Sequence, residues 1–446
     1  MRIYFKRDFH SWQAWLVLAM AFAGHAHAAT DTDFAVENAA ARLQTTYLWQ
    51  TKPGFPGGSN PPMSLVTQRE KRSYTLTATA YLGVRPWDDA ELFFNPEMAQ
   101  GRTLSGLTGL GGLSNGESQK GVGPNPIFYN ARLFLRHTWN FGEKTEKQEA
   151  ELNQLASLVA RERMVLTVGK IAVSDIFDDN AFAHDPRTQF INWALMANGA
   201  YDYAADSRGY SVGAALEYFR GDWEFRIGRF TLPIESNGLP LDYKIMKHYG
   251  DNVEVVHNHE FGGLKGAIRA LAYRNHIVTG GFLDAAAASP GSADLSLVRR
   301  LQDKKGFGLN MDQMLTTELG VFGRYSKSDG KTETYAFAEI DRSVSFGASL
   351  KGRPWGREED TLGAAFVRND ISGDHQTFMA NSGAGVFIGG WPQTRFASER
   401  IFEGYYSLAL AKSSWLTLDY QHITNPAYNP DRGPVRIFGV RLHAEF

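Results

Sequence analysis

The sequence contains no cysteine and no large excess of either charge. Its 446 residues include 46 Lys and Arg against 48 Asp and Glu. Without cysteine no disulfide can stabilise the fold, so stability must come from burial and backbone pairing. A nucleic-acid partner would require basic residues gathered on one face, and the balanced charge does not support one. No phosphate-binding loop or dinucleotide fingerprint occurs either, and we expect no cofactor.

Long hydrophobic runs are missing as well. The apolar run from Ala14 to Gly24 has 11 residues, too short for a spanning helix. Basic residues precede it and the small triplet Ala26-His27-Ala28 follows, which is the order of a secretory signal peptide. We predict that residues 1–28 are a cleaved signal peptide, the alternative being a buried N-terminal helix, and that residues 29–446 form one domain. That domain carries 43 basic and 47 acidic residues.

Aromatic residues and glycine, by contrast, are abundant, with 29 Phe, 18 Tyr, 10 Trp and 45 Gly. Short segments with alternating apolar and polar residues recur from end to end. Near the end of the chain, Phe438, Val440 and Leu442 alternate with Arg441 and His443. A period of two indicates half-buried strands, because successive side chains point to opposite faces.

This alternation fits two all-β architectures. In a soluble sandwich the polar face meets water, whereas a transmembrane barrel turns its apolar face to lipid and its polar face to a wet lumen. Three features favour a transmembrane antiparallel β-barrel: the signal peptide, the closing strand, and aromatic residues near strand ends that could form interfacial girdles. The aromatic residues concerned are Trp49, Trp139, Trp223 and Trp415.

Short and long connections alternate along the chain, as expected for periplasmic turns and extracellular loops. Residues 85–89 and 412–414 are short turns, whereas residues 100–126 and 373–400 are long loops. Leu152, Leu155, Leu158 and Val159 recur at helical spacing, which predicts a short periplasmic helix. We count about 17 candidate strands, and single-chain bacterial barrels have an even number. Sixteen strands are therefore expected, with eighteen as the alternative.

Five segments in order resemble the carbohydrate-selective porins of the OprB type, and the similarity runs from about Ala41 to Phe446. The resemblance implies a sixteen-stranded outer-membrane barrel of a Gram-negative bacterium that passes glucose-like sugars by passive diffusion. It also implies that the barrel-assembly machinery recognises Phe446. We expect outer-membrane lipid and lipopolysaccharide around the barrel, and a homotrimer is one option for its assembly. The segments are "GKIAVSDIFDDNAFAHDPRTQFINWAL", "AFAEIDRS", "LKGRPWGREED", "EGYYSLAL" and "LDYQHITNPAYNPDRGPVRIFGVRLHAEF".

Selectivity in a pore comes from its width and from the groups that line its narrowest part. A sugar slide requires charged or amide side chains beside aromatic rings. A basic side chain that faces the bilayer midplane costs about 2–4 kcal/mol, so charged strand residues are predicted to point inward. They could also be ordinary lumen charges that keep the pore wet. The residues predicted on strands that line the channel are Lys170, Glu224, Arg226, Phe322, Arg324, Phe337, Glu339, Asp341 and Arg441.

The long connection between residues 175 and 206 is rich in acidic residues. We predict that it folds inward and forms the constriction, with Asp175, Asp178 and Arg187 facing barrel-wall arginines. Lys170 could reach the same constriction, although its strand phase is ambiguous. An exposed acidic loop and a calcium site are the alternatives, but the spacing lacks the EF-hand pattern.

Hydrolase and metal signals are weak. Residues 209–213 match the G-x-S-x-G pattern, but a strand follows where a nucleophilic serine would need a helix. His257 and His259 could share one strand face, yet no third ligand follows at matching spacing. The sequence therefore predicts a sugar-selective porin with no catalytic residue. The alternatives are a porin for organic acids or aromatic compounds, an outer-membrane barrel enzyme, and a soluble secreted β-rich protein.

Overall fold

The structure is a computed structural model that describes residues 34–121, 123–335 and 338–446. The predicted signal peptide and Phe337 lie outside these residues. No helix within the described ranges is both long enough and apolar enough to span a membrane.

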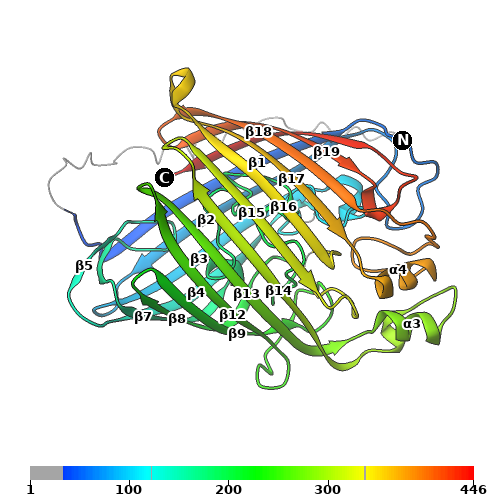
Figure 1. The fold of residues 1–446 in the computed structure, drawn as a ribbon, viewed down its shortest axis with the longest axis horizontal. Helices are drawn as coiled ribbons and strands as arrows, with labels where there is room; N and C mark the ends of the chain where they lie inside the picture. Colours follow the sequence, from blue (N-terminus) through cyan, green and yellow to red (C-terminus); the bar gives the residue numbers. More distant parts are fainter. Residues whose placement is uncertain (1–33, 122, 336–337) are drawn as a thin grey trace, which may run out of the picture.

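Sixteen antiparallel strands form a closed barrel, which confirms the predicted fold class (Figure 1). Each strand pairs with its neighbours along the chain, so the topology is a simple meander. The wall strands are β1 (Ala39–Lys52), β2 (Glu70–Val84), β3 (Ala90–Arg102), β4 (Gly123–Asn140), β7 (Arg163–Ile171), β8 (Ser211–Arg220), β9 (Trp223–Phe230), β12 (Tyr249–Phe261), β13 (Leu264–Thr279), β14 (Arg300–Met314), β15 (Leu319–Ser328), β16 (Arg342–Gly352), β17 (Arg357–Asp370), β18 (Glu399–Ala411), β19 (Ser414–Thr424) and β20 (Val435–Glu445).

Smaller elements lie in the connections. Two short sheets pair β5 (Lys144–Gln148) with β6 (Ser157–Ala160), and β10 (Leu232–Pro233) with β11 (Leu241–Asp242). The α-helices are α2 (Trp193–Met196), α3 (Phe282–Ala288) and α4 (Gly373–Ala380). Single 3-10 turns are η1 (Leu104–Leu107), η2 (Val173–Asp175), η3 (Leu295–Leu297), η4 (Arg353–Trp355) and η5 (Pro426–Tyr428).

The two ends of the barrel differ, as the alternation of connections predicted. At one end the strands are joined mostly by tight turns, such as residues 221–222 and 412–413. At the other end all eight connections are longer, and α3 and α4 pack together there (Figure 1). Barrels of this kind keep short turns on the periplasmic side, so we call the two ends the inner and outer ends.

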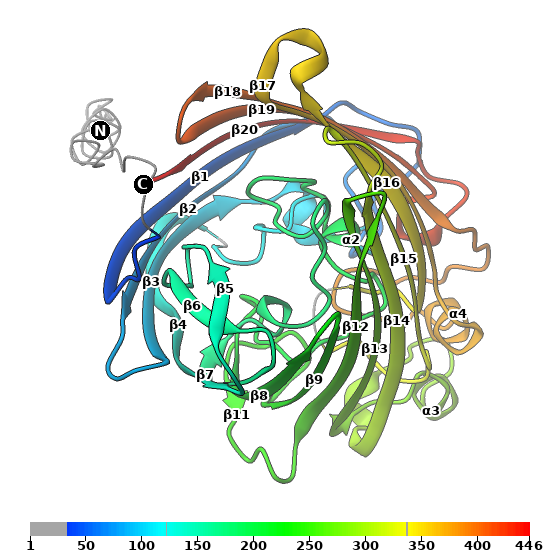
Figure 2. The same ribbon diagram turned by 60° about the vertical axis from the view of Figure 1, so that its left-hand side comes forward.

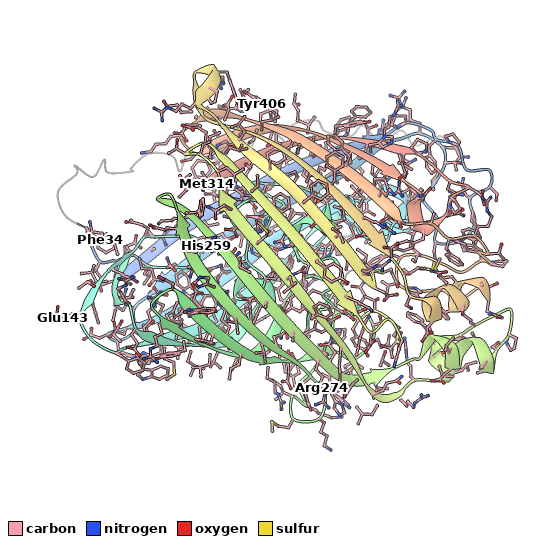
Figure 3. All side chains as sticks on the ribbon, in the orientation of Figure 1. Phe34, Glu143, His259, Arg274, Met314 and Tyr406 are labelled. Carbon is pink, nitrogen blue, oxygen red and sulfur yellow. The ribbon has the colours of Figure 1, made fainter. Side chains whose placement is uncertain are left out.

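Side chains alternate between the two faces of the wall. On β9, Trp223, Phe225 and Ile227 are about half exposed on the outside, whereas Glu224 and Arg226 face inward. The last strand follows the same rule, with Phe438 and Leu442 outside and Arg441 fully buried. Figure 3 shows both layers of side chains. The outer layer is the apolar surface that a lipid-facing wall requires.

The predicted periplasmic helix is wrong. Strands β5 and β6 form a hairpin there, and Figure 2 shows it inside the inner mouth of the barrel. Its turn is held by wall side chains, because Glu91 accepts the backbone N–H of Leu155 at 3.0 Å and Glu37 accepts that of Ala156 at 2.9 Å. These contacts satisfy backbone groups without a helix, and Leu155 is buried against the wall.

The predicted strand over residues 334–341 is also wrong. Its described residues form a loop between β15 and β16, where the side chains of Glu339 and Asp341 accept backbone N–H groups from the connection between β17 and β18. Removing this candidate strand reconciles the count of about 17 with an even barrel. Within the long connection predicted over residues 373–400, residues Gly373–Ala380 form α4.

Strands β1 and β20 close the barrel. Leu43 and Phe446 exchange two backbone hydrogen bonds, each 2.8 Å long. The ladder then continues through eight residue pairs from Gln44 and Glu445 to Thr51 and Phe438. Closure leaves no free edge on the wall, which is what a lipid environment demands.

A solute path inside the barrel

The long connection between β7 and β8, residues 172–210, folds into the lumen, as predicted. We call it the inserted loop; it contains α2 and lies within the barrel in Figure 2. Most of its residues are buried. Its polar groups bond to strands on opposite sides of the wall, so the loop crosses the lumen instead of lying against one side.

Two wall arginines hold this loop through its backbone. Arg441 on β20 donates to the carbonyl oxygens of Pro186, Thr188 and Gln189 at 2.7–2.9 Å. Five strands away around the wall, Arg324 on β15 donates to Leu195 O at 2.7 Å, and its Nε lies 3.5 Å from the carboxylate of Asp178. Both arginines therefore point inward, but their bonds go to the loop.

Other wall groups satisfy the remaining polar groups of the loop. Glu403 on β18 accepts the N–H groups of Ile191 and Asn192 at 2.5 and 3.0 Å. Glu254 on β12 accepts the N–H of Asp178 at 2.8 Å. Buried backbone groups need such partners, and each partner fixes one point of the loop.

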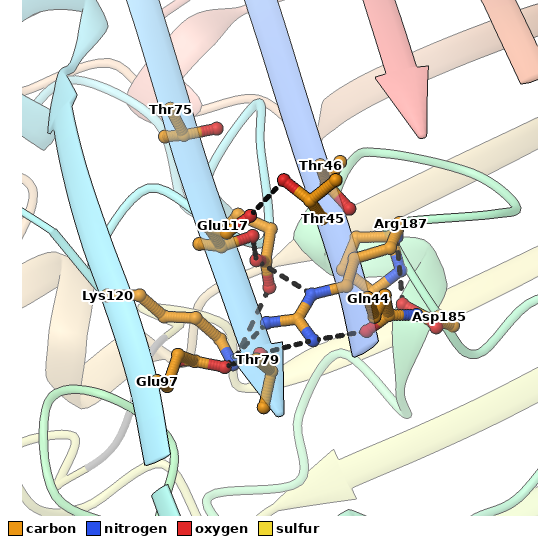
Figure 4. A network of polar contacts seen from close by, with 12 residues as sticks. Gln44, Thr45, Thr46, Thr75, Thr79, Glu97, Glu117, Lys120, Asp185 and Arg187 are labelled. Atoms are coloured by element: carbon orange, nitrogen blue, oxygen red, sulfur yellow. Dashed lines mark hydrogen bonds and ion pairs between the residues drawn. The ribbon is translucent and has the colours of Figure 1, made fainter. Parts of the chain in front are cut away.

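Arg187 is the centre of a buried charge cluster (Figure 4). Its Nε donates to Glu117 at 2.9 Å, its Nη2 to Glu97 at 2.9 Å, and its Nη1 to Gln44 at 2.6 Å. Lys120 lies 3.7 Å from Glu97 and 3.6 Å from Glu117. Two cations thus face two carboxylates. Glu97 belongs to β3, Glu117 and Lys120 belong to the Gly-rich connection 103–122, and Arg187 belongs to the inserted loop.

This cluster binds the Gly-rich connection 103–122 and the inserted loop to the wall. Glu97 also accepts hydrogen bonds from Thr79, Tyr129 and Tyr210. Neighbouring carboxylates hold the pKa of Lys120 above its usual range although burial opposes this shift. Because all three guanidinium nitrogens of Arg187 are already engaged, it acts as an anchor rather than as a free sugar contact.

The inner half of the lumen carries a second charged group with more solvent access. Arg226 on β9 lies 3.3 Å from Glu217 and 3.0 Å from Glu254, and it also pairs with Glu224. Their side chains are up to 14% exposed. Nearby, Arg269 pairs with Asp312 at 2.5 Å and lies 4.0 Å from Asp179. This side of the path therefore has more carboxylates than cations.

A cavity of about 510 Å³ opens among the long connections at the outer end. Four connections line it: 231–248, 280–299, 329–341 and 371–398. Its polar groups include a bidentate ion pair between Arg299 and Glu333, with both distances 2.9 Å. The lining residues used below are Asn237, Phe282, Arg299, Glu333, Glu339 and Val386. The volume lies within the usual range of small-molecule pockets.

Glu339 lines this cavity, and Glu339 and Asp341 lie on either side of His375 from α4. His375 Nδ1 is 3.1 Å from Asp341, and Nε2 is 3.6 Å from Glu339. Burial raises the pKa of Glu339, and His375 offsets this effect only in part. Burial would also raise the pKa of Asp341, but the hydrogen bond and charge of His375 and the charge of Lys304 lower it to about 2.

The other predicted residues are spread over the structure. Asp175 forms a bidentate pair with Arg132 at 2.6 and 2.7 Å. Phe322 faces inward and packs on Phe190 of the inserted loop, with ring centroids 5.6 Å apart. Lys170 lies in register with the outward-facing Leu133, and its ammonium donates to a backbone carbonyl outside the Arg187 cluster.

The acidic residues of the inserted loop do not converge on a calcium ion. Asp175 and Asp178 pair with different arginines, and Asp185 accepts the N–H of Arg187 at 2.8 Å. Within the described ranges, no group of three or more Asp, Glu, His or Cys side chains forms a metal site.

The sequence analysis missed several residues of the lumen. Glu97, Glu117 and Lys120 were not selected, although Glu97 follows the alternation of β3 and therefore points inward. Arg299, Glu333 and His375 were missed because they belong to the long connections at the outer end, where no strand periodicity shows which side chains meet. Only the fold brings these segments together.

Comparison with known proteins agrees with this architecture. The family profile described as "Carbohydrate-selective porin, OprB family" matches residues 79–446. The chain belongs to this family. The structure of OprB from Pseudomonas putida has a TM-score of 0.68 to this OprB-family chain at 15% identity, covering 92% of this chain and 94% of that chain. At this identity the likeness supports the fold alone.

Curated relatives are also porins. Porin AaxA of Chlamydia muridarum is 23% identical over 293 residues, and Porin AaxA of Chlamydia trachomatis serovar A is 23% identical over 292 residues. Each match covers 63% of this chain and 52% of the relative. The OprB-family chain thus spans about half the length of these curated relatives. The chain is therefore a member of a porin family and has a barrel fold like that of P. putida OprB.

Proposed function

We propose that this porin carries small, neutral, glucose-like sugars across the outer membrane by passive diffusion. The family description supports the solute class. The observation that carries the proposal is the pairing of charges inside the barrel. Arg187, Arg226, Arg269, Arg299 and Arg324 each lie within 3.5 Å of at least one inward carboxylate.

Such pairing favours a neutral solute over an anion. Unpaired arginines would concentrate organic anions in the lumen, whereas neutralised arginines give them no net attraction. Paired charges still offer donors and acceptors that sugar hydroxyls can use. Each contact stays weak, which a diffusion path requires. Organic acids, the alternative considered from the sequence, are therefore disfavoured.

The proposed route runs from the outer cavity to the inner charged group. A sugar would first meet Arg299, Glu333 and Asn237, which line this cavity. It would then pass the inserted loop and leave beside Glu224 and Arg226. The inserted loop, held by Arg324 and Arg441, sets the width of this route.

Liposome swelling with three solutes of one size tests the proposal. Glucose, gluconate and glucosamine differ mainly in charge. We expect glucose to enter faster than gluconate, and disaccharides to enter more slowly than glucose. Equal rates for glucose and gluconate would refute sugar preference and leave a general porin. Empty liposomes and liposomes with heat-unfolded protein are the controls.

A small organic cation is a second candidate solute. Three glutamates surround Arg226, and Asp179 beside Arg269 is 56% exposed, so the inner half of the path has an acidic excess. This field would raise the local concentration of cations. Glucosamine that enters faster than glucose at low salt, but not at high salt, would favour this candidate.

We also propose that a signal peptide is removed and that the assembly machinery recognises the last residue. Residues 1–28 would be removed as a signal peptide, so the protein purified from outer membranes should begin at Ala29. The assembly machinery would recognise Phe446, whose ring is 42% exposed at the barrel seam. A homotrimer stays a prediction, and cross-linking in intact membranes would test it.

A further inference from the structure

Four basic residues gather on the outside of the barrel, near the outer end of four neighbouring strands. Lys327 on β15, Arg342 on β16, Arg368 on β17 and Arg400 on β18 all belong to the lipid-facing side of the wall. All four are exposed. We call them the outer basic cluster.

The strand register places like charges of this cluster opposite one another, which destabilises the sheet unless a counter-charge is nearby. Lys327 pairs directly with Arg342, and Arg368 pairs directly with Arg400. Like charges opposite one another destabilise a sheet. Asp370 offsets part of the charge, at 3.0 Å from Arg342 and 3.3 Å from Arg368. Among the described residues, no carboxylate lies within 4.0 Å of Lys327 or Arg400.

A row of aromatic rings lies beside the cluster, one step toward the membrane centre. Neighbouring rings are 5.0–6.4 Å apart across five strands. On β17 and β18, Phe366 and Phe402 are the outward residues next to Arg368 and Arg400. The row consists of Phe346, Phe366, Phe402, Tyr420 and Phe438.

This pair of rows fits one kind of partner. An amphipathic molecule with fixed phosphates and several acyl chains would place the phosphates against the cluster and the chains against the rings. Guanidinium groups bind phosphate through paired, charge-assisted hydrogen bonds. Long connections mark the extracellular side, so the cluster lies at the outer leaflet. We propose that the outer basic cluster is a binding site for the phosphate groups of outer-leaflet lipopolysaccharide.

The aromatic row could instead face a second copy of the chain. Two features favour the lipid. The cluster brings four positive charges against one carboxylate, which phosphates neutralise directly. The rings also lie where interfacial aromatic residues of barrels normally lie, at the boundary between headgroups and chains. The proposal is independent of which solute the porin carries.

Native mass spectrometry of the full mature protein in detergent tests the site, with deep-rough lipopolysaccharide as the probe. The variant is Lys327→Gln/Arg368→Gln/Arg400→Gln. Each basic residue beside an anionic surface contributes about fivefold to binding, so we expect a loss of about a hundredfold. The matched control, Lys265→Gln/Lys351→Gln/Lys412→Gln, removes three exposed charges at the inner end and should bind like the wild type.

Further readouts separate the other occupants. Heat-dependent gel migration and glucose entry should be unchanged in both variants, which shows that barrel and path are intact. Dephosphorylated lipopolysaccharide should bind the wild type as weakly as the phosphorylated form binds the triple variant. Unchanged binding in that variant would overturn the proposal. So would equal retention of phosphatidylglycerol by the wild type, or loss of an oligomer without loss of lipid.

Discussion

At the scale of single residues, Arg187 shows how the lumen tolerates charge. It is 7% exposed and faces Glu97 and Glu117, which are 0% and 4% exposed. Replacing it by Met would leave two buried carboxylates that only Lys120 opposes. Breaking a buried ion pair on one side costs about 3–5 kcal/mol. We expect Arg187→Met to lower the free energy of unfolding by about this amount in guanidinium titrations of the reconstituted protein.

A double-variant cycle tests whether the loss of stability comes from the unpaired buried charge. Arg187→Met/Glu97→Gln removes one charge of each sign and should recover part of the lost stability. Arg353→Met is the matched control, because Arg353 is 68% exposed and its pair with Glu318 lies at a turn. A loss as large in Arg353→Met as in Arg187→Met would contradict the role given to burial.

The raised pKa of Glu339 predicts that the stability of the outer loops depends on pH. Its pKa in the fold is raised, whereas an unfolded glutamate titrates near about 4.3. Between these two values the folded loops bind more protons, so their stability falls as pH rises through this window. The pKa of Asp341, about 2 in the fold, acts in the opposite direction and only at lower pH. Glu339→Gln should remove the fall.

Hydrogen exchange of the Val386 amide measures this effect, because that N–H donates to Oε1 of Glu339. The glutamine keeps this acceptor. We expect protection in the wild type to fall as pH rises above the unfolded pKa, and to fall less in Glu339→Gln, because only the wild type has a carboxyl whose pKa is raised by burial. His375 and Asp341 are present in both proteins, so the difference reports on the carboxylate of Glu339. Equal pH profiles of Val386 protection in the two proteins would contradict this prediction.

At the scale of elements, alternation was a reliable guide to strands and a poor guide to connections. The face of β9, β15 and β20 followed from period two alone, because wall strands have one apolar side. The hairpin of β5 and β6 did not follow, since Leu152 and Leu155 lie on its turn, where helical spacing is accidental. Side chains of Glu37 and Glu91, far away in sequence, satisfy its backbone.

The inserted loop should loosen when its wall arginines are removed. Arg441→Met would abolish the bonds to three loop carbonyls, and Arg324→Met would abolish the one to Leu195. A hydrogen bond to a charged group contributes about 1.5–3 kcal/mol, so the loss of even two of the three bonds of Arg441 should populate a displaced loop at least about a hundredfold more.

Single-channel recordings in planar bilayers would detect this displacement. We expect additional conductance levels in Arg441→Met and faster entry of disaccharides into liposomes. Arg229→Met is the matched control, because Arg229 pairs with Asp251 on the outer face of the wall. Identical traces for wild type and Arg441→Met would show that the loop does not set the width of the path.

At the scale of the whole molecule, the barrel was predictable and its lumen was only partly so. Repeated alternation, long loops at one end and the family-like segments determine a closed wall. The inward course of the connection was predicted for residues 175–206 from its length and charges, but its partners were not. Arg187 meets Glu97 and Glu117 only after the wall has closed, so no local pattern could assign that cluster.

The last prediction concerns Phe446, which lies at the seam where β1 and β20 close the barrel. Backbone groups of Phe446 form two bonds with Leu43, whereas its exposed ring forms none of the ladder bonds. Phe446→Ala should therefore fold in vitro into lipid vesicles at the wild-type rate, because the seam is preserved. In cells, recognition by the assembly machinery would be lost, and we expect the folded, heat-modifiable form in outer membranes to fall several-fold. Leu442→Ala, which also removes an exposed apolar group from β20, should assemble normally. A defect of Phe446→Ala in both settings would instead assign the ring to seam stability.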